Sequence, residues 1–195
     1  MSQEMFPGRI TPVAAAGFVG LASLFNMLGR FFWASTSDYI GRKNTYFCFM
    51  VLGFILYCSV PYMGTTGNIV GFVVCFLVIY TMYGGGFATV PAYLKDMFGT
   101  RYVGAIHGLL ITAWSMAGIF GPVLVNYIRQ YNIDHGVPKA DAYNVTMYIM
   151  AGLFIIGFIA NALIKAVNQK FHMHPDHEAL KGQVAVDAAG EPAGA

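Results

Sequence analysis

Charge is scarce in this sequence of 195 residues, and its scarcity excludes most soluble proteins. Only 10% of the residues are charged, against about a quarter in an ordinary soluble domain, and 57% are hydrophobic. Asp, Glu, Lys and Arg are missing altogether from residues 10–29, 44–94, 102–128 and 142–164. Because a membrane-crossing helix needs about 20 apolar residues, the longest stretch has room for two helices and each of the others for one. The sequence therefore predicts an all-α, polytopic membrane protein with five transmembrane helices.

Cysteines are also few, and the net charge is small. Cys48, Cys58 and Cys75 fall in the uncharged stretches without the spacing of a metal site or redox motif, so we interpret them as small buried apolar residues. A formal net charge of +2 is too small to indicate nucleic-acid binding. Three histidines and an aspartate lie close together at 172–177, but Gly and Ala flank them, which favours a solvated tail over a metal site. No nucleophile–base pair or phosphate-binding loop is recognisable, so we predict neither an enzyme nor a cofactor.

The polar and Gly-rich connections divide the chain. We expect an external N-terminal segment at 1–10 and a disordered cytoplasmic tail at 168–195. Between them we expect a transmembrane domain, 11–167, with helices at about 11–33, 45–61, 68–94, 102–128 and 145–167.

Loop charge predicts the orientation. One side of the predicted bundle would carry seven cationic residues: Arg42, Lys43, Lys95, Arg101, Lys165, Lys170 and Lys181. The other side would carry Arg9, Arg129 and Lys139. Because Lys and Arg accumulate in cytoplasmic loops, the C-terminus is expected in the cytoplasm and the N-terminus outside a plasma or inner membrane. An external N-terminus without a preceding signal helix suggests the back part of a longer chain.

The stretch from Gly29 to Lys43 carries the most specific pattern in the sequence. Gly29 and Arg30 are followed by Asp38 and then by Gly41, Arg42 and Lys43 before the next apolar run. This order and spacing resemble motif A of the major facilitator superfamily, although a generic basic turn would share some of its residue types. The resemblance implies that Gly29, Asp38, Gly41, Arg42 and Lys43 form a cytoplasmic gating loop.

Two later stretches extend this resemblance. The first contains Gly84, Gly85, Gly86 and Pro91, and the second contains His107, Trp114, Gly118, Gly121 and Pro122. They look like helices ten and eleven of the oxalate:formate antiporter branch of the superfamily. The five helices would then be numbers eight to twelve, a partial C-terminal half of a major facilitator fold, whose partners would be the missing helices one to seven. The glycines and prolines would let helices bend during transport, or would simply kink them for packing.

Three residues are candidates for substrate binding. Arg30 is a full charge within a predicted span, and it would either pair with a substrate carboxylate or belong to the gate. His107 and Trp114 share a helical face and could donate hydrogen bonds to a carboxylate, or could pack against a neighbouring helix. In the antiporter branch, a basic residue of helix eight and a Lys of helix eleven hold the dicarboxylate. Residues 102–128 contain no Lys or Arg, so the chain departs from the branch there.

Two functions follow from these patterns. The first is a secondary transporter, by resemblance an antiporter, for small organic anions such as mono- or dicarboxylates, which this chain would form in part. The second is a short, non-transporting membrane protein that associates with partner helices through small residues such as Gly17 and Gly20.

Overall fold

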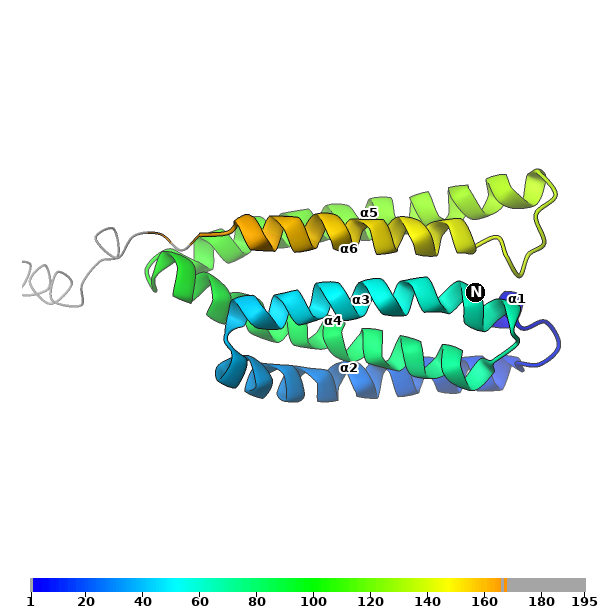
Figure 1. Cartoon of the computed structure of the whole chain (residues 1–195), viewed down its shortest axis with the longest axis horizontal. Coiled ribbons are helices and arrows are strands. Elements are labelled where there is room, and N and C mark those ends of the chain that lie inside the picture. Colours follow the sequence, from blue (N-terminus) through cyan, green and yellow to red (C-terminus); the bar gives the residue numbers. More distant parts are fainter. Residues whose placement is uncertain (1, 166, 168–195) are drawn as a thin grey trace, which may run out of the picture.

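The computed structural model describes residues 2–165 and 167, and within them the protein is all-α. It consists of a short helix, α1 (Ser2–Met5), and five long ones: α2 (Pro12–Ile40), α3 (Arg42–Thr65), α4 (Ile69–Phe98), α5 (Val103–Asp134) and α6 (Asn144–Leu163). All five long helices are long and apolar enough to cross a membrane. They run antiparallel in sequence order, so α1 and the end of α6 lie at opposite ends of the bundle (Figure 1). The predicted all-α class and the five spans are confirmed.

Local sequence sets where the helices begin. The Thr11 hydroxyl accepts a hydrogen bond from the amide of Ala14 at 3.2 Å, and Pro12, which has no amide hydrogen to satisfy, opens α2. The Asn68 side chain caps α4 in the same way, accepting from the amide of Gly71 at 2.9 Å. These caps satisfy amides that a helix N-terminus otherwise leaves unpaired.

The connection between α2 and α3 is a single residue, Gly41. The sequence favours a polar segment between helices ending at 33 and starting at 45, whereas α2 continues to Ile40 and α3 begins at Arg42. Gly41 has φ of +87°, a conformation that other residues rarely adopt, and its amide donates to the carbonyl of Ser37. The side chains of Thr36 and Ser37 donate to carbonyls of their own helix, so these polar residues remain helical.

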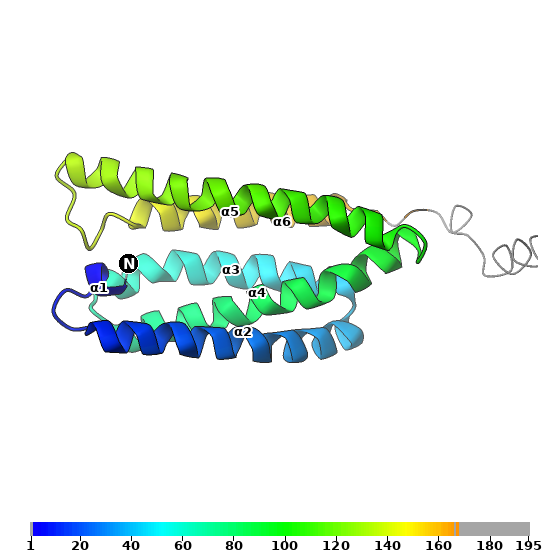
Figure 2. The same cartoon turned by 180° about the vertical axis from the view of Figure 1, so that it is seen from behind.

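Helices α2 and α4 pack closely along their length (Figure 2). Gly29 lies against the backbone of Thr81, and Gly84 lies against the backbone of Asn26, so closely that a methyl group on either glycine would overlap with the facing carbonyl. The Trp33 indole donates to the Thr81 hydroxyl at 3.2 Å. Small residues and an interhelical hydrogen bond are the usual means of association where lipid provides no hydrophobic driving force.

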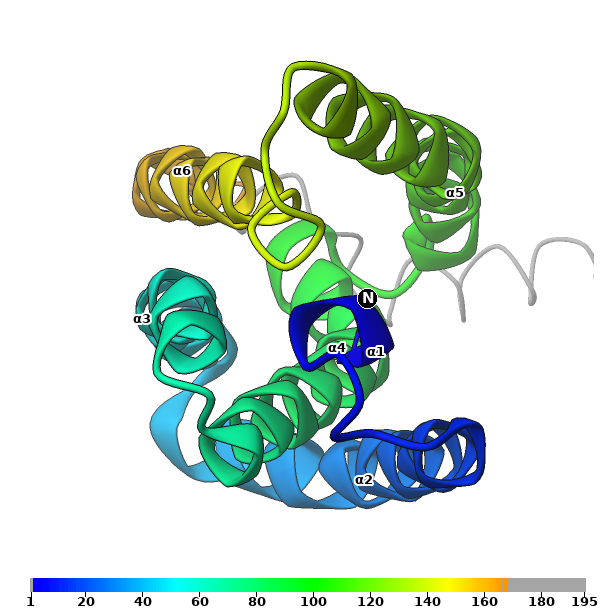
Figure 3. The same ribbon diagram turned by 90° about the vertical axis from the view of Figure 1, so that its right-hand side faces the viewer.

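The remaining helices differ in how much they bury. Helix α3 packs on both α4 and α6, whereas α5 makes few contacts and has no buried residue among those described (Figure 3). A core of buried apolar residues lies at the end of the bundle that carries α1, where Met5 and Phe6 cluster with Val60, Phe72 and Met147. We call this end the Glu4 end and the opposite one, with the turn between α2 and α3, the Gly41 end.

The three cysteines do not share one environment. Cys75 is buried as expected, but Cys58 is half-buried and Cys48 is exposed on α3. The expectation of three buried cysteines was therefore wrong for Cys48. Apolar side chains in a membrane-crossing helix can face lipid as readily as protein, so an apolar stretch does not tell the two apart.

Candidate functional site

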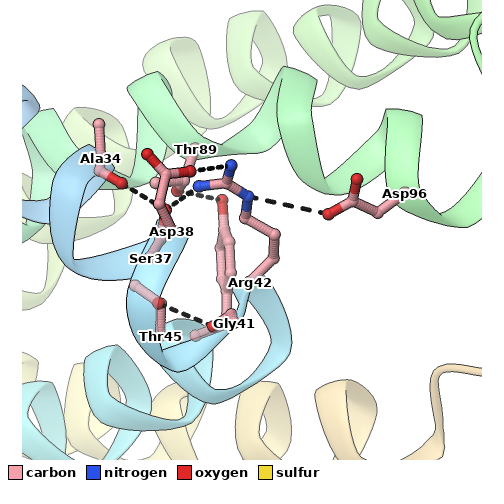
Figure 4. Close-up of polar contacts among 9 residues, drawn as sticks. Ala34, Ser37, Asp38, Gly41, Arg42, Thr45, Thr89 and Asp96 are labelled. Carbon is pink, nitrogen blue, oxygen red and sulfur yellow. Dashed lines mark hydrogen bonds and ion pairs between the residues drawn. The ribbon is translucent and has the colours of Figure 1, made fainter.

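A polar cluster at the Gly41 end brings together Asp38 and Arg42, two of the five predicted gating residues, on either side of a third, Gly41. Arg42, at the start of α3, hydrogen-bonds to the side chains of Ser37 and Asp38 across the Gly41 turn (Figure 4). Its Nε atom also lies 3.8 Å from Oδ2 of Asp96, near the end of α4. One guanidinium therefore connects the ends of three helices, and we call Ser37, Asp38, Arg42 and Asp96 the Arg42 cluster.

The Arg42 cluster combines two shielded side chains with two exposed carboxylates. Ser37 is buried and Arg42 is mostly shielded, while 62% of the side-chain surface of both Asp38 and Asp96 is exposed. Exposed ion pairs contribute about 0.2–1 kcal/mol because water screens them and ordering long side chains costs entropy. Such contacts can break and reform as helices move.

Lys43, the other cation among the predicted gating residues, turns away from this cluster towards α6. Its ammonium donates to the carbonyls of Ala162 and Ile164, at 3.2 and 2.8 Å. A positive charge at the C-terminal end of a helix satisfies carbonyls that lack a partner and complements the helix dipole. Lys43 thus attaches the end of α6 to the start of α3.

Asn161 completes this attachment. It is 4% exposed, and its amide donates to the carbonyl of Lys43 at 3.1 Å while its oxygen accepts from the Tyr93 hydroxyl at 3.0 Å. One side chain on α6 therefore bonds to both α3 and α4 beside the Arg42 cluster. Sequence reasoning missed Asn161, although a polar amide within an apolar stretch was a visible signal.

A second site is an open cavity of about 570 Å³ lined by α3, α4, α5 and α6. His107 and Trp114 of α5 both line it, so the structure brings these two predicted residues together. Arg30 is exposed on α2 and is not among the residues that line the cavity. Arg30 is nevertheless close enough to interact electrostatically with Tyr83, which does line the cavity.

Aromatic rings make up much of the cavity wall. The Trp114 ring centroid lies 4.2 Å from that of Phe87 and 5.2 Å from that of Tyr83, and Tyr83 and Phe87 are 5.4 Å apart. Tyr46 of α3 also lines the cavity, and its hydroxyl donates to the carbonyl of Gly86 at 3.0 Å. The Nδ1 atom of His107 is buried and has no hydrogen-bond partner among the described residues. Buried polar atoms in native proteins almost always have a hydrogen-bond partner, so this unpaired nitrogen is unusual.

The predicted flexible positions fall into two groups. Gly84 and Gly85 lie in the tight interface with α2, whereas Gly86 has open space around it. Gly118 and Gly121 also have open space, on the sparsely packed α5. Pro91 and Pro122 both lie within continuous helices, α4 and α5. Packing therefore explains Gly84 and Gly85, while the role of the other positions as bending sites stays a prediction.

The Glu4 end has an ionic cluster of its own, which the sequence did not indicate. The Glu4 carboxylate accepts from the Arg129 guanidinium, with a bond from Nε at 3.0 Å, and from the Tyr143 hydroxyl at 2.7 Å. The hydrogen bonds from Arg129 and then from Tyr143 lower the pKa of Glu4 to about 2. The partners are more than 120 residues apart in the sequence, so no local pattern links them.

The described residues include no group of three or more His, Cys, Asp or Glu side chains that could hold a metal ion. The His172–His177 stretch, like the predicted tail at 168–195, lies outside them.

These features define a multi-pass helical membrane protein with a charged turn between its first two spans and an aromatic cavity among α3, α4, α5 and α6. Residues 9–189 match the model of the Major Facilitator Superfamily, and the chain belongs to that family. This identifies a membrane transporter family and confirms the resemblance at the level of the superfamily.

Several curated proteins are similar to parts of this chain. The Oxalobacter formigenes oxalate:formate antiporter is 31% identical over 103 residues, which are 53% of this chain and 24% of that protein. A probable inorganic phosphate transporter 1-5 of Oryza sativa is 30% identical over 157 residues, or 75% of this chain and 27% of the relative. The Escherichia coli sialic acid transporter NanX is 25% identical over 63% of this chain and 30% of the relative. The chain thus spans about a quarter of the length of these relatives, and no solved structure matches it significantly.

Proposed function

We propose that this chain forms helices eight to twelve of a secondary transporter for small organic anions that works by alternating access. The Arg42 cluster is the observation that carries this proposal. It connects α2, α3 and α4 through exposed charge pairs that are weak enough to exchange partners. A transporter needs such contacts, because its two access states must differ little in free energy.

The likeness to the oxalate:formate antiporter and to the sialic acid transporter supports an organic anion as substrate. We place Arg30, His107 and Trp114 on the path of that anion, with exchange as the mode of transport. His107 and Trp114 would meet it in the cavity, while Arg30, on α2, would act outside it. The Gly41 end is assigned to the cytoplasm because Arg42, Lys43 and Lys95 gather there.

The uneven burial of the helices supports the presence of further helices in the working transporter. Helix α5 has no buried residue among those described, whereas α4 buries residues against both α2 and α3. A transporter of this family binds substrate between two halves of six helices each. Helices one to seven, supplied by a longer product or by a second chain, would cover α5 and complete the substrate path.

Uptake of labelled anions into proteoliposomes tests the proposal. One preparation holds this chain alone, and the other holds it together with helices one to seven of the oxalate:formate antiporter. We expect saturable uptake of oxalate, formate or sialic acid in the combined preparation only, and no uptake of mannitol as the neutral control. Saturable uptake by the chain alone would overturn its assignment as a partial transporter. Combined uptake that does not favour anions over mannitol would overturn the substrate class.

A further inference from the structure

Helix α5 carries its cavity-lining residues on one half only. These residues all precede Gly118: His107, Leu110, Ile111, Ala113, Trp114 and Ala117. The part of α5 from Gly118 to Asp134 supplies none of the described lining residues. We call residues 103–117 the cavity half of α5 and residues 123–134 the anchored half, because the two halves also differ in how they are held.

The anchored half is attached to the Glu4 end of the bundle. Arg129 donates to the Glu4 carboxylate of α1, with a bond from Nε at 3.0 Å. The Asn132 side chain donates to the carbonyl of Ala142, a fully buried residue, at 3.1 Å. Val125 packs against the apolar core at this end. Hydrogen bonds to two other segments and apolar packing therefore fix this half in place.

The cavity half is held more loosely. Its two hydroxyl groups, on Thr112 and Ser115, donate to carbonyls of α5 itself. Residues 108–120 are all exposed. Beside the cavity, the Trp114 ring packs against two aromatic rings of α4. Ring–ring contacts of this kind add little to the burial of the rings, so they can break and form again.

The two halves meet where the helix can bend. Pro122 has no amide hydrogen, so the carbonyl of Gly118, four residues earlier, lacks its helical hydrogen bond. Gly118 and Gly121 have open space around them, so no neighbouring atom blocks a change of direction. Sharp bends in helices occur mostly at such residues. At its other end, the cavity half joins α4 through the non-helical residues 99–102, so it can tilt relative to α4.

We propose that α5 is a hinged lid over the cavity. The cavity half tilts about Gly118 and Pro122 and thereby opens the wall that α5 forms, while the bond of Arg129 to Glu4 keeps the anchored half in place. The structure holds the lid closed, with Trp114 resting on the rings of α4. Helix α1 thus holds the end of α5 against which the lid moves. This inference goes beyond the proposed function, because it concerns a motion within this chain.

Distances between spin labels on the full chain in lipid nanodiscs test the lid. Cys48, which is exposed on α3, carries the reference label, and the other two cysteines are removed as Cys58→Ala and Cys75→Ala. The second label is placed at Ala105 in the cavity half or at Tyr127 in the anchored half, both of which are exposed. We call the distance from Cys48 to Ala105 the lid distance and that to Tyr127 the anchor distance.

The hinge sets the expected lid distance. Ala105 lies 13 residues from Gly118, about 20 Å along the helix, so a bend of about 20° displaces it by about 7 Å. We therefore expect two lid distances that differ by up to about 7 Å, and one narrow anchor distance. Pro122→Ala restores the hydrogen bond to the Gly118 carbonyl and should leave a single lid distance. Asn126→Ala, also exposed on α5, is its control and should leave both lid distances.

A second pair of variants tests the attachment to α1. Glu4→Gln should broaden the anchor distance, because a neutral amide accepts a weaker hydrogen bond from Arg129 than a carboxylate does. Asp134→Asn is the matched control. Asp134 is exposed at the end of α5 and accepts from Gln130 of the same helix, so its substitution should leave the anchor distance unchanged.

Four results would overturn the inference. They are a single lid distance in the unsubstituted chain, two lid distances that persist in Pro122→Ala, an anchor distance that varies as much as the lid distance, and an anchor distance that Glu4→Gln does not broaden. The measurement uses this chain alone and no anion. A failure of the lid would therefore leave the proposed transport of organic anions standing.

Discussion

Gly29 of α2 lies directly against the backbone carbonyl of Thr81 in α4. No side chain fits between the two helices at this point, so Gly29→Ala should push them apart. Overpacking of this kind costs about 1–3 kcal/mol, which exceeds the gain of up to about 1 kcal/mol that alanine brings to a helix. Thermal unfolding in detergent should therefore show a lower midpoint for Gly29→Ala than for the unsubstituted protein.

Gly20 provides the matched control for that experiment. It lies on the same helix with open space around it, so Gly20→Ala should leave the midpoint unchanged or raise it slightly. Equal effects of the two substitutions would contradict the close packing of α2 on α4.

The contact of Glu4 with Arg129 and Tyr143 predicts a dependence of stability on pH. The pKa of Glu4 is lowered from 4.5 to about 2 in the folded protein, so the stabilisation is complete above about pH 4.5 and is lost as the pH falls towards 2. After allowance for the partial exposure of this carboxylate, we expect its ionisation to contribute about 1–2 kcal/mol to the free energy of unfolding. The difference in unfolding free energy between the unsubstituted protein and Glu4→Gln should shrink over this interval. A constant difference between pH 5 and pH 2 would show that the Glu4 carboxylate is not held by Arg129.

Asn161 should stabilise the Gly41 end through its two hydrogen bonds. Asn161→Ala leaves the Lys43 carbonyl and the Tyr93 hydroxyl without this partner. Interhelical hydrogen bonds in membranes contribute less than about 2 kcal/mol each, so we expect a loss of about 1–2 kcal/mol in unfolding free energy. Asn126→Ala, at an exposed position of α5, is the control and should change little. Equal losses from both substitutions would speak against the proposed attachment of α6.

Much of the fold was predictable because it depends on apolar stretches that the sequence displays directly. Missing charges located the five spans, since a helix in lipid must satisfy its own backbone and has little room for unpaired charge. The helix ends were less predictable. Thr36 and Ser37 were predicted to lie in a loop, yet their hydroxyls donate to carbonyls within α2. The helix is interrupted only at Gly41.

The candidate site was predictable only where its residues lie close in the sequence. Asp38 and Arg42 are four residues apart and fell within one motif, whereas Asp96 joins them from another helix. Likewise, His107 and Trp114 share one helical face, which periodicity reveals, but the cavity they line also needs α3, α4 and α6. Arg30 stood out as a charge in a span, and only the packing of α2 shows that it is not one of the residues that line that cavity.

The central claim is that Arg42 acts in the transport of an anion, and counterflow tests it most directly. Proteoliposomes with the combined transporter, preloaded with unlabelled anion, take up labelled anion only if the binding site alternates between the two sides. Arg42→Gln removes the charge that faces Asp38 and Asp96, while Lys139→Gln removes an exposed charge at the Glu4 end.

We predict that Arg42→Gln lowers counterflow at least about tenfold, equivalent to about 1.4 kcal/mol, while anion binding changes less than about twofold. Lys139→Gln should leave both unchanged. Counterflow that survives Arg42→Gln would contradict a gating role for the Arg42 cluster, and absence of counterflow in the unsubstituted transporter would contradict the proposed function itself.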